Sequence, residues 1–483
     1  MKKFFLFLLL MLLIVICVVV YNTINFKPNP TIVDKVAEVE VPVDAVSHMA
    51  EAISIRTVSF EDEADFDSIQ FQKFNDFLSI TYPLLYERTQ HTIFSGYSHL
   101  FKLSGTDESV KPVIIMGHHD VVPIASPTIW SVHPFTEGVK NDTIYGRGCI
   151  DDKGPVISIL ESIEQLLGEG FQPKRTIYFA FGHDEEVSGP RGAVEIVKYL
   201  KKEGVTAEFI LDEGGVITNG LVPGVSEGTA MVGIAEKGYV TYELTVNMVG
   251  GHSSQPARET SIDVMATAIS KLKKNPFQEK MTPVIESFMD ELGPYMDLRS
   301  RVVFSNRWLF ESLLLRQFAK SKQRSASVRT TTSPTIFEAG IKENVIPTAA
   351  RAVVNFRIIP GETVATVKEH IIATIDDDRI AVDIKGKGFD PSPISPIDGE
   401  AFKIISKSIN QIYPKVVIVP NLVIGATDSR HYVDLSSNIY RFAPFHLTPD
   451  NVNCFHGVDE RISVEEFENA IRFYRQLILN SSN

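Results

Sequence analysis

The chain has 483 residues, of which 44% are hydrophobic and 22% charged, and its formal net charge is −13. This length exceeds what one simple hydrophobic core supports, so we expect two or three domains. The acidic balance argues against a nucleic-acid partner, because such a partner favours a basic face. Three cysteines cannot form a disulfide framework, although a single Cys149–Cys454 bridge stays open.

The N-terminus predicts a membrane segment. Lys2 and Lys3 precede an uncharged apolar run, residues 4–21, which is about the length that spans a bilayer as a helix. A cleaved signal peptide would have a shorter apolar core and small residues at the cleavage site, whereas this run ends in Val-Val-Val-Tyr. We therefore favour an uncleaved single-pass anchor (1–21) over secretion after cleavage, with the remainder outside the cytoplasm. Residues 22–42 contain prolines and predict a tether.

Residues 43–238 alternate strand and helix patterns, which is typical of an α/β layer fold. Buried strands are predicted at 112–116, 175–181 and 207–211, and helices with apolar residues at helical spacing lie between them. Each strand is followed by His or carboxylate residues: GHHD at 117–120, GHDEEVSG at 182–189 and DEGG at 212–215. In open α/β sheets, ligands bind at this edge.

Residues 239–387 predict a smaller α+β unit inserted into the larger domain. Its strands are expected at 239–248, 335–341, 350–359 and 380–384, and its helices at 260–272 and 363–375. The segment 275–333 interrupts this pattern with helical patches, and we interpret it as an extra segment that would cover the site. The α/β pattern resumes in residues 388–483, where Ser463-x-x-Glu466 has the pattern of a capping box before a final helix.

The clusters at the strand ends are weak evidence when each is taken alone. Glu185 and Glu186 would serve a hydrolytic metal site if one held the metal and the other moved a proton, but an isolated pair is more often a solvated turn. His118 alone would more often be a core histidine, and Asp151 the acidic start of a helix. Together with the remaining candidates, these residues provide the imidazole and oxygen ligands that suit zinc. The remaining candidates are Asp212, Glu213 and His456.

Six motifs in this order resemble metallopeptidase family M-twenty, a family of di-zinc hydrolases. They are H-x-D-V-V-P at 118–123, Y-G-R-G-x-x-D-D-K at 145–153, D-E-E-V-x-G at 184–189, L-D-E-G-G at 211–215, G-G-H-S-S at 250–254 and F-H-G at 455–457. The residues of these motifs are most similar to those of the carboxypeptidase S-like branch, which includes N-fatty-acyl amino acid hydrolases/synthases. The resemblance covers residues 45–480. It implies an α/β catalytic domain with a mixed sheet flanked by helices, plus an inserted lid and dimerisation domain.

The resemblance also implies two zinc ions per subunit. The implied ligands are His118, Asp151, Glu186, either Asp212 or Glu213, and His456. Asp151 would bridge the ions, next to a cis Asp151–Asp152 peptide, while His118 and Glu186 would bind different ions. For the third carboxylate the family motif accepts either acid, and we slightly favour Asp212.

Two further residues would act on the chemistry without being ligands. Asp120 would hydrogen-bond the His118 imidazole and fix its tautomer. Glu185 would be the general base, because a carboxylate tied to metal is a poor base whereas its uncoordinated neighbour is free to exchange protons.

The inserted unit would supply substrate-binding residues in a homodimer. His252 resembles a histidine that the partner subunit contributes to steady the oxyanion, although a helix-capping loop histidine is the alternative. Asn344 and Arg357 match positions that bind a substrate carboxylate; Arg430 would do the same or form a structural salt bridge.

The sequence therefore predicts a membrane-anchored di-zinc amidohydrolase acting on peptides with a free C-terminus or on N-acyl amino acids. For the second substrate, the segment 275–333 would provide an apolar wall for a fatty acyl chain. A non-catalytic ectodomain is the alternative from another class. That alternative predicts lost ligands, yet every ligand position of the motifs is filled.

Overall fold

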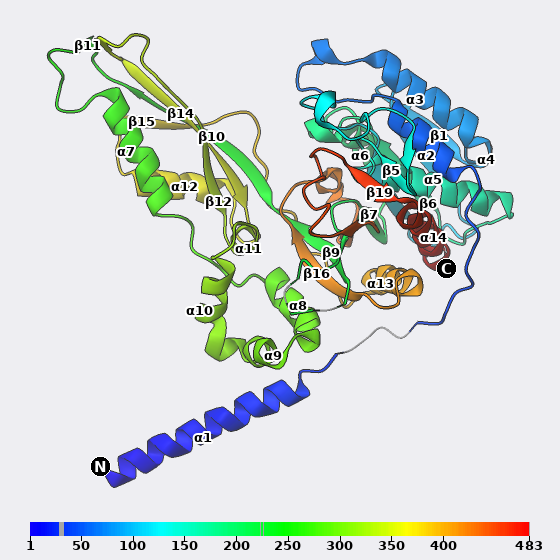
Figure 1. Ribbon diagram of the computed structural model, residues 1–483, viewed down its shortest axis with the longest axis horizontal. Coiled ribbons are helices and arrows are strands. Elements are labelled where there is room, and N and C mark those ends of the chain that lie inside the picture. The colour runs from blue at the N-terminus through cyan, green and yellow to red at the C-terminus, as the bar shows by residue number, and fades with distance from the viewer. Residues whose placement is uncertain (29–32, 223, 226, 483) are drawn as a thin grey trace.

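The computed structural model describes residues 1–28, 33–222, 224, 225 and 227–482. Figure 1 shows a larger domain that contains the C-terminus, an elongated smaller unit, and helix α1 (Lys2–Asn25), which projects from the molecule. Helix α1 extends beyond the predicted end of the anchor at residue 21. Its last turn is held by a hydrogen bond from Asn22 to Asn306 and by one between the hydroxyls of Thr23 and Ser305. The tether is correspondingly shorter than predicted, and its residues 29–32 lie outside the described residues.

The larger domain is organised around a mixed ten-stranded sheet. Its order is β1-β2-β6-β3-β7-β17-β9-β8-β18, and β16 pairs with β9. The strands are β1 (Gln90–Phe94), β2 (Ser98–Leu103), β3 (Val113–His118), β6 (Ile177–Gly182), β7 (Phe209–Asp212), β8 (Ile217–Thr218), β9 (Thr229–Glu236), β16 (Val417–Val423), β17 (Ile439–Arg441) and β18 (His446–Leu447). The predicted strands β3, β6 and β7 are parallel neighbours, whereas β1 and β2 are antiparallel.

Helices cover both faces of this sheet, which explains the continuous apolar runs in its central strands. On one face, Val113 and Ile115 of β3 pack with α2 (Ala45–Ser54), α3 (Ser68–Thr81), α4 (Pro83–Arg88), α5 (Lys153–Gly168), α13 (Glu400–Ile412) and α14 (Val464–Ser481). On the other face, Ile114 and Met116 pack against α6 (Ala193–Lys202). The capping box at the start of α14 is present as predicted.

The cysteines are unpaired. Cys149 and Cys454 are both buried and free, so the bridge that the sequence left open does not form. Near Cys149, a three-stranded sheet of β4 (Gly138–Lys140), β5 (Thr143–Tyr145) and β19 (Arg461–Ser463) joins the two halves of the larger domain.

The smaller unit has a separate sheet and core. Its antiparallel order is β12-β14-β10-β15, with β12 (Thr331–Ala339), β14 (Ala349–Ile358), β10 (Gly238–Asn247) and β15 (Ile380–Ile384). Helices α7 (Ser261–Lys274) and α12 (Val364–Ile375) pack on this sheet and bury a cluster of aliphatic and aromatic side chains. A short pair, β11 (Gly251–His252) and β13 (Val345–Ile346), forms the tip of the unit (Figure 1).

The segment 275–333 contains four helices: α8 (Pro283–Leu292), α9 (Leu298–Ser305), α10 (Arg307–Phe318) and α11 (Lys322–Val328). At the end of α8, Leu292 packs against Val417 and Val419 of β16 in the larger sheet. Helix α9 packs beside α1. The segment thus packs on β16 and α1, while Phe277 at its start belongs to the core of the smaller unit. A role in covering the site remains a prediction.

Two chain crossings connect the larger domain to the smaller unit. Strand β9 ends at Glu236 and β10 begins at Gly238, so Lys237 alone separates the two sheets. The returning chain runs alongside, because the backbone N–H of Tyr239 donates to Phe389 O at 2.9 Å and the reverse bond is 2.8 Å. A side chain at Gly238 would lie 2.6 Å from Phe389 O, so the two crossings require glycine to approach this closely. We call these paired crossings the hinge ribbon.

Candidate metal centre

The candidate ligands lie where three parallel strands end. β3 ends at His118, which lies in register with Gly182 at the end of β6. Glu185 and Glu186 follow in the short 3-10 helix η3 (Glu185–Val187), and Glu213 follows β7. Because parallel strands end at the same edge, residues far apart in the sequence meet there.

Asp151 occupies the centre of the cluster. Its Oδ1 lies 3.0 Å from His118 Nε2, and its Oδ2 lies 2.6 Å from His456 Nε2. One carboxylate thus contacts both histidines, although they come from opposite halves of the larger domain. The Asp151–Asp152 peptide bond is cis, as the family resemblance implied.

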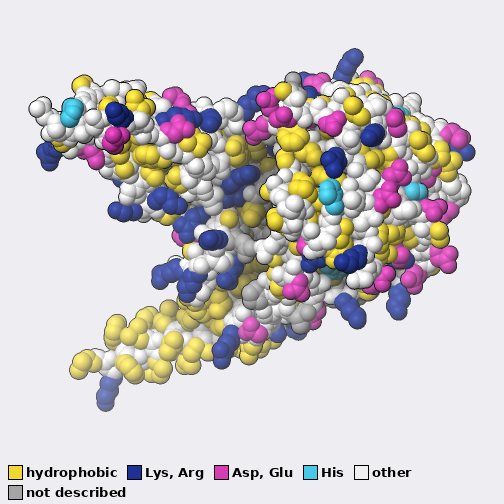
Figure 2. Space-filling view, turned by 45° about the horizontal axis from the view of Figure 1, so that its top comes forward, with side chains coloured by type: hydrophobic (Ala, Val, Ile, Leu, Met, Phe, Trp, Pro, Cys, Tyr) yellow, Lys and Arg dark blue, Asp and Glu magenta, His cyan; other side chains and the backbone are white. Residues whose placement is uncertain are grey.

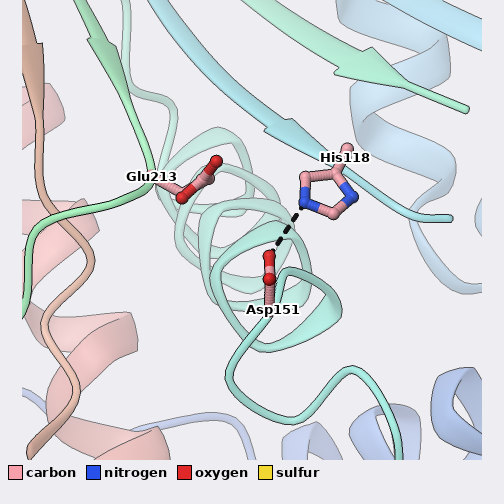
Figure 3. A group of neighbouring side chains, drawn as sticks. All are labelled: His118, Asp151 and Glu213. Carbon is pink, nitrogen blue, oxygen red and sulfur yellow. Dashed lines mark hydrogen bonds and ion pairs between the residues drawn. The ribbon is translucent and has the colours of Figure 1, made fainter. Parts of the chain in front are cut away.

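The side chains form two groups of three that share Asp151. One group is His118, Asp151 and Glu213; the other is Asp151, Glu186 and His456, and within each the candidate ligand atoms lie within 4.8 Å of one another. Figure 3 shows the first group, with Glu213 and His118 pointing toward the carboxylate of Asp151. In each group, an imidazole and two carboxylates thus lie close enough together to hold one metal ion.

The structure places Glu213, rather than the favoured Asp212, in the first group. Asp212 is the last residue of β7, and its Oδ2 accepts a hydrogen bond of 2.8 Å from the backbone N–H of Ser429. Successive residues at a strand end point to opposite sides, so one of the two acids faces the cluster and the other faces away. The preference for Asp212 is therefore not supported by this geometry.

Asp120 connects His118 to the turn that carries the two glutamates. Its fully buried carboxylate lies 3.3 Å from His118 Nδ1, whose other neighbour is the Asp120 carbonyl oxygen at 3.0 Å. The same carboxylate accepts hydrogen bonds of 3.1 Å from the backbone N–H groups of Glu185 and Glu186, and one of 2.7 Å from the hydroxyl of Ser59. Asp120 thus fixes the imidazole and the glutamate backbone relative to each other.

Glu185 lies beside the cluster but belongs to neither group of three. Its Oε2 is 4.0 Å from His118 Nε2. Burial raises the pKa of the Glu185 carboxyl well above its ordinary value, and the negative charges of Asp428 and Glu186 add to this rise. A carboxyl group with a raised pKa near reacting atoms is suited to accept and return a proton.

The donor set fits metal cations. Oε1 of Glu186 is buried and has no hydrogen-bond partner among the described residues; its neighbour His456 Nε2 lies 3.4 Å away. Burial raises the pKa of the Glu213 carboxyl well above its ordinary value, and the charges of Asp151 and Asp212 act in the same direction. Acids buried this close together are unfavourable without a positive charge between them. Bound cations would supply that charge, and imidazole with carboxylate suits zinc.

A buried ion pair that the sequence did not predict joins the loop that carries Asp151 to the loop that carries His456, and we call these the two ligand loops. Arg147 Nη1 lies 2.6 Å from Glu460 Oε2, and both side chains are almost fully buried. Glu460 Oε1 accepts the backbone N–H groups of Gly148, Ile150 and Asp151, while Arg147 Nη2 donates to the carbonyl oxygen of His456. Both charges belong to segments rich in motif residues, but no spacing signal pairs residues 313 positions apart.

Arg357 and Arg430 lie on either side of the hinge ribbon. The Arg357 guanidinium carbon is 4.9 Å from the ring centre of Tyr239, and that of Arg430 is 5.1 Å from the ring centre of Phe389. The two rings stack at 6.0 Å, so they stand between the two guanidinium groups. Arg430 also donates to the carbonyl oxygen of Ser188 at 3.0 Å, which places it beside the glutamate turn.

His252 and Asn344 lie elsewhere in the chain. They meet at the tip of the smaller unit, where the backbone N–H of Ser253 donates to Asn344 O at 3.2 Å and His252 is exposed. Figure 1 shows this tip at the far end of the smaller unit from the larger domain. The structure therefore does not bring them to the metal cluster within one chain, and a contribution across a dimer stays a prediction.

The strand-end edge and the two His–carboxylate groups define a metallohydrolase. Residues 114–480 match the family model "Peptidase family M20/M25/M40", and the chain belongs to this family. The resemblance found in the sequence motifs is thereby confirmed.

The relatives include proteins named for each of the two predicted substrates. The chain is 41% identical over 443 residues to "Probable carboxypeptidase S-like 2" of Dictyostelium discoideum, covering 91% of this chain and 85% of the relative. It is also 41% identical over 457 residues to "N-fatty-acyl-amino acid synthase/hydrolase PM20D1" of Xenopus tropicalis, covering 94% and 88%.

Solved structures confirm the mixed α/β fold. The M20 family metallo-carboxypeptidase Sso-CP2 of Sulfolobus solfataricus has a TM-score of 0.65 at 17% identity, covering 91% of this chain and 99% of that one. A dinuclear metal binding peptidase of Bacillus subtilis has a TM-score of 0.56 at 15% identity, covering 90% and 96%.

Proposed function

We propose that this metallohydrolase is an amidohydrolase with two zinc ions, which cleaves a C-terminal peptide bond or the amide bond of an N-acyl amino acid. The observation that carries the proposal is the carboxylate of Asp151, which contacts both His118 and His456. With Glu213 and Glu186, these residues offer two ligand groups that share one carboxylate. Zinc ions bound there would polarise the scissile carbonyl and make water a better nucleophile near neutral pH.

In this proposal, Glu185 carries the proton. It takes a proton from the attacking water and returns it to the nitrogen of the leaving amine, so that the C–N bond breaks without releasing an amide anion. Asp120 supports this role because it binds the backbone N–H group of Glu185 and also contacts His118. The backbone of Glu185 thus keeps a fixed position relative to His118.

Recognition of a free substrate carboxylate is assigned to the arginines beside the hinge ribbon. Arg357 and Arg430 offer guanidinium groups whose planar donors match a carboxylate. His252 and Asn344 at the exposed tip would join the site from a partner subunit, which makes the proposed enzyme a homodimer. Size measurement in solution together with loss of activity in His252→Ala tests that arrangement.

The substrate decides between the two candidate activities. A carboxypeptidase hydrolyses a dipeptide faster than an N-oleoyl amino acid, whereas the relative named N-fatty-acyl-amino acid synthase/hydrolase supports the reverse order. We would measure both rates on the zinc-loaded full chain, with C-terminally amidated versions of each substrate as controls. Cleavage of the amidated substrates at equal rates would contradict the assignment of the arginines, and absence of any amide cleavage would contradict the proposed function.

Location at a membrane is part of the proposal. Helix α1 has a mean hydropathy of 3.3 in its most apolar window, and its side chains project from the molecule. At about 1.5 Å per residue, its length suffices to cross a bilayer. We propose that it remains attached as an anchor, with the catalytic domain outside the cytoplasm. Resistance of the membrane-bound chain to alkaline extraction, with an intact N-terminus by mass spectrometry, tests this.

A further inference from the structure

The last turns of α1 are packed into the segment that contains α9. Asn306 is fully buried, and both the oxygen and the nitrogen of its side-chain amide form hydrogen bonds with α1. Its Oδ1 accepts a 3.0 Å hydrogen bond from Asn22 Nδ2, while its Nδ2 donates to Val19 O and Thr23 Oγ1, both at 3.3 Å. Loss of α1 would leave buried polar atoms of Asn306 without these partners, which is unfavourable. The helix is therefore a structural neighbour of α9.

A second contact fixes the direction in which the chain leaves α1. The ring of Phe26 lies against Gly293, where an added side chain would come within 2.5 Å of it. Arg301 extends toward the carbonyl oxygens of Thr23 and Phe26, at 3.5 and 3.4 Å. These carbonyls are at the end of α1, where intrahelical partners are lacking. The position of α9 relative to the end of the proposed anchor is thus fixed by packing and by hydrogen bonds.

The polar end of α1 marks where the apolar helix would leave the hydrocarbon. Trp308 of α10 borders the same groove as Asn22, Asn25 and Phe26, so it lies at the level of that end. Its side chain is 57% exposed. Tryptophan is enriched at the boundary between hydrocarbon and water, because its ring is apolar and its N–H is polar.

Other apolar side chains near this boundary also face outward. Leu309 and Leu313 of α10 are each 46% exposed and lie one helical turn apart, so they share a face. Leu298 at the start of α9 is 66% exposed. Figure 1 shows α9 beside the C-terminal end of α1, with α10 next to α9. These leucines extend the apolar surface of the anchor onto the folded domain.

The same segment is strongly basic in an acidic protein. Residues 298–328 contain seven Lys or Arg and one Glu, a net charge of +6 in a chain whose net charge is −13. Arg307 is paired with Asp290, but Arg316 and Lys320 are exposed and follow the leucine face of α10 by one and two turns. Figure 2 shows Lys and Arg side chains gathered between the yellow rod of α1 and the smaller unit.

We propose that residues 298–328, the α9–α11 surface, rest on the extracytoplasmic leaflet of the lipid bilayer that α1 enters. The leucines and Trp308 insert at the headgroup level, and the basic side chains contact lipid phosphates. This proposal extends the membrane anchoring proposed above. The contact would hold the folded domain against the leaflet, so that the domain does not swing freely on the tether.

A bilayer fits this surface better than a second copy of the chain. If the α9–α11 surface met itself across a twofold axis, two segments of charge +6 would face each other. The phosphate groups of a lipid leaflet instead complement the charge, and the leaflet is continuous with the environment of α1.

The test uses the full chain reconstituted into vesicles through α1. The chain has two tryptophans, and the other, Trp130, is buried beside Arg147 in the larger domain. We expect brominated phosphatidylcholine to quench Trp308 fluorescence in vesicles that also contain phosphatidylglycerol. The quenched component should be missing in Trp308→Phe. The double variant Arg316→Glu/Lys320→Glu should shift the contact equilibrium away from the bilayer on the order of thirtyfold, at about 1 kcal/mol for each basic charge. Lys403→Glu/Lys407→Glu on α13 is the matched control and should leave quenching unchanged.

Each other outcome has a definite meaning. If dissolved acrylamide quenches Trp308 in the vesicles as in detergent and brominated lipid does not, the α9–α11 surface is not on the bilayer. Shielding from both quenchers would mean that protein covers it, which also overturns the proposal. Alkaline extraction tests the anchor separately from the α9–α11 surface. If it releases the chain from the vesicles, α1 does not act as a membrane anchor. Brominated-lipid quenching when those anionic vesicles are added back to the released chain supports the surface, and its absence overturns it.

Discussion

Replacing Glu460 by glutamine would test how the two ligand loops are held together. The change keeps the shape of the side chain but removes the negative charge that faces Arg147 at 2.6 Å. The Arg147 guanidinium would then be buried without its counter-ion. Breaking a buried ion pair from one side costs about 3–5 kcal/mol. Because a typical domain is stable by about 5–15 kcal/mol, we expect Glu460→Gln to fold with a clearly reduced free energy of unfolding.

The same substitution should weaken metal binding. Glu460 holds the backbone N–H of Asp151, and its partner Arg147 holds the carbonyl oxygen of His456. Groups that orient metal ligands in this way typically change metal affinity by about 10–100-fold when removed. We would measure the free energy of unfolding of the metal-free protein in urea, and metal affinity by competition with a chelator.

Two further variants make this test specific. Glu195→Gln removes one member of an exposed ion pair with Lys198 and should cost less than about 1 kcal/mol, with metal affinity unchanged. Adding Arg147→Met to Glu460→Gln removes the unpaired charge, so it should restore stability without restoring metal affinity. If Glu460→Gln had the stability and the metal affinity of the unmodified chain, the proposed role of the pair would be wrong.

Three more outcomes follow from the same structure. Glu185→Gln should retain its metal, measured by elemental analysis, and lose about 10²–10⁴-fold in kcat; substantial residual turnover would refute its role as the base. Glu213→Gln should weaken metal binding in chelator competition far more than Asp212→Asn, and the opposite order would restore the preference drawn from the sequence. Burial lowers the pKa of His99 well below its ordinary value. Above about pH 6.5 the imidazole is neutral in the folded and the unfolded chain, so its titration does not reduce the free energy of unfolding there. Below that pH the unfolded chain takes up the proton first, so His99 by itself lowers the free energy of unfolding by about 1.4 kcal/mol for each pH unit. In urea unfolding, His99→Gln should reduce the slope of stability against pH by about that amount, and an unchanged slope would refute the role of His99.

The sequence predicted the central strands and most of the site for physical reasons. β3, β6 and β7 are buried on both faces, so they form continuous apolar runs, and their polar ends mark the edge where ligands gather. The sequence could not decide between Asp212 and Glu213, because that choice depends on which side of β7 faces the cluster. The Arg147–Glu460 pair could not be predicted either, because the pairing arises only when the two halves of the larger domain meet in the fold. Similarly, the pattern of 275–333 predicted helices but not the surface on which they pack.

The hinge ribbon affects the length of substrate that the proposed site can accept. Arg357 belongs to the smaller unit and Arg430 to the larger domain, with the stacked rings of Tyr239 and Phe389 between them. The hydrogen bonds between Tyr239 and Phe389 hold the two crossings side by side, so the two guanidinium groups keep their places beside one rigid pair of rings. Arg430 is also bonded to the carbonyl oxygen of Ser188 in the glutamate turn. The hinge ribbon would therefore set the span between the carboxylate end of a bound substrate and the bond to be cut.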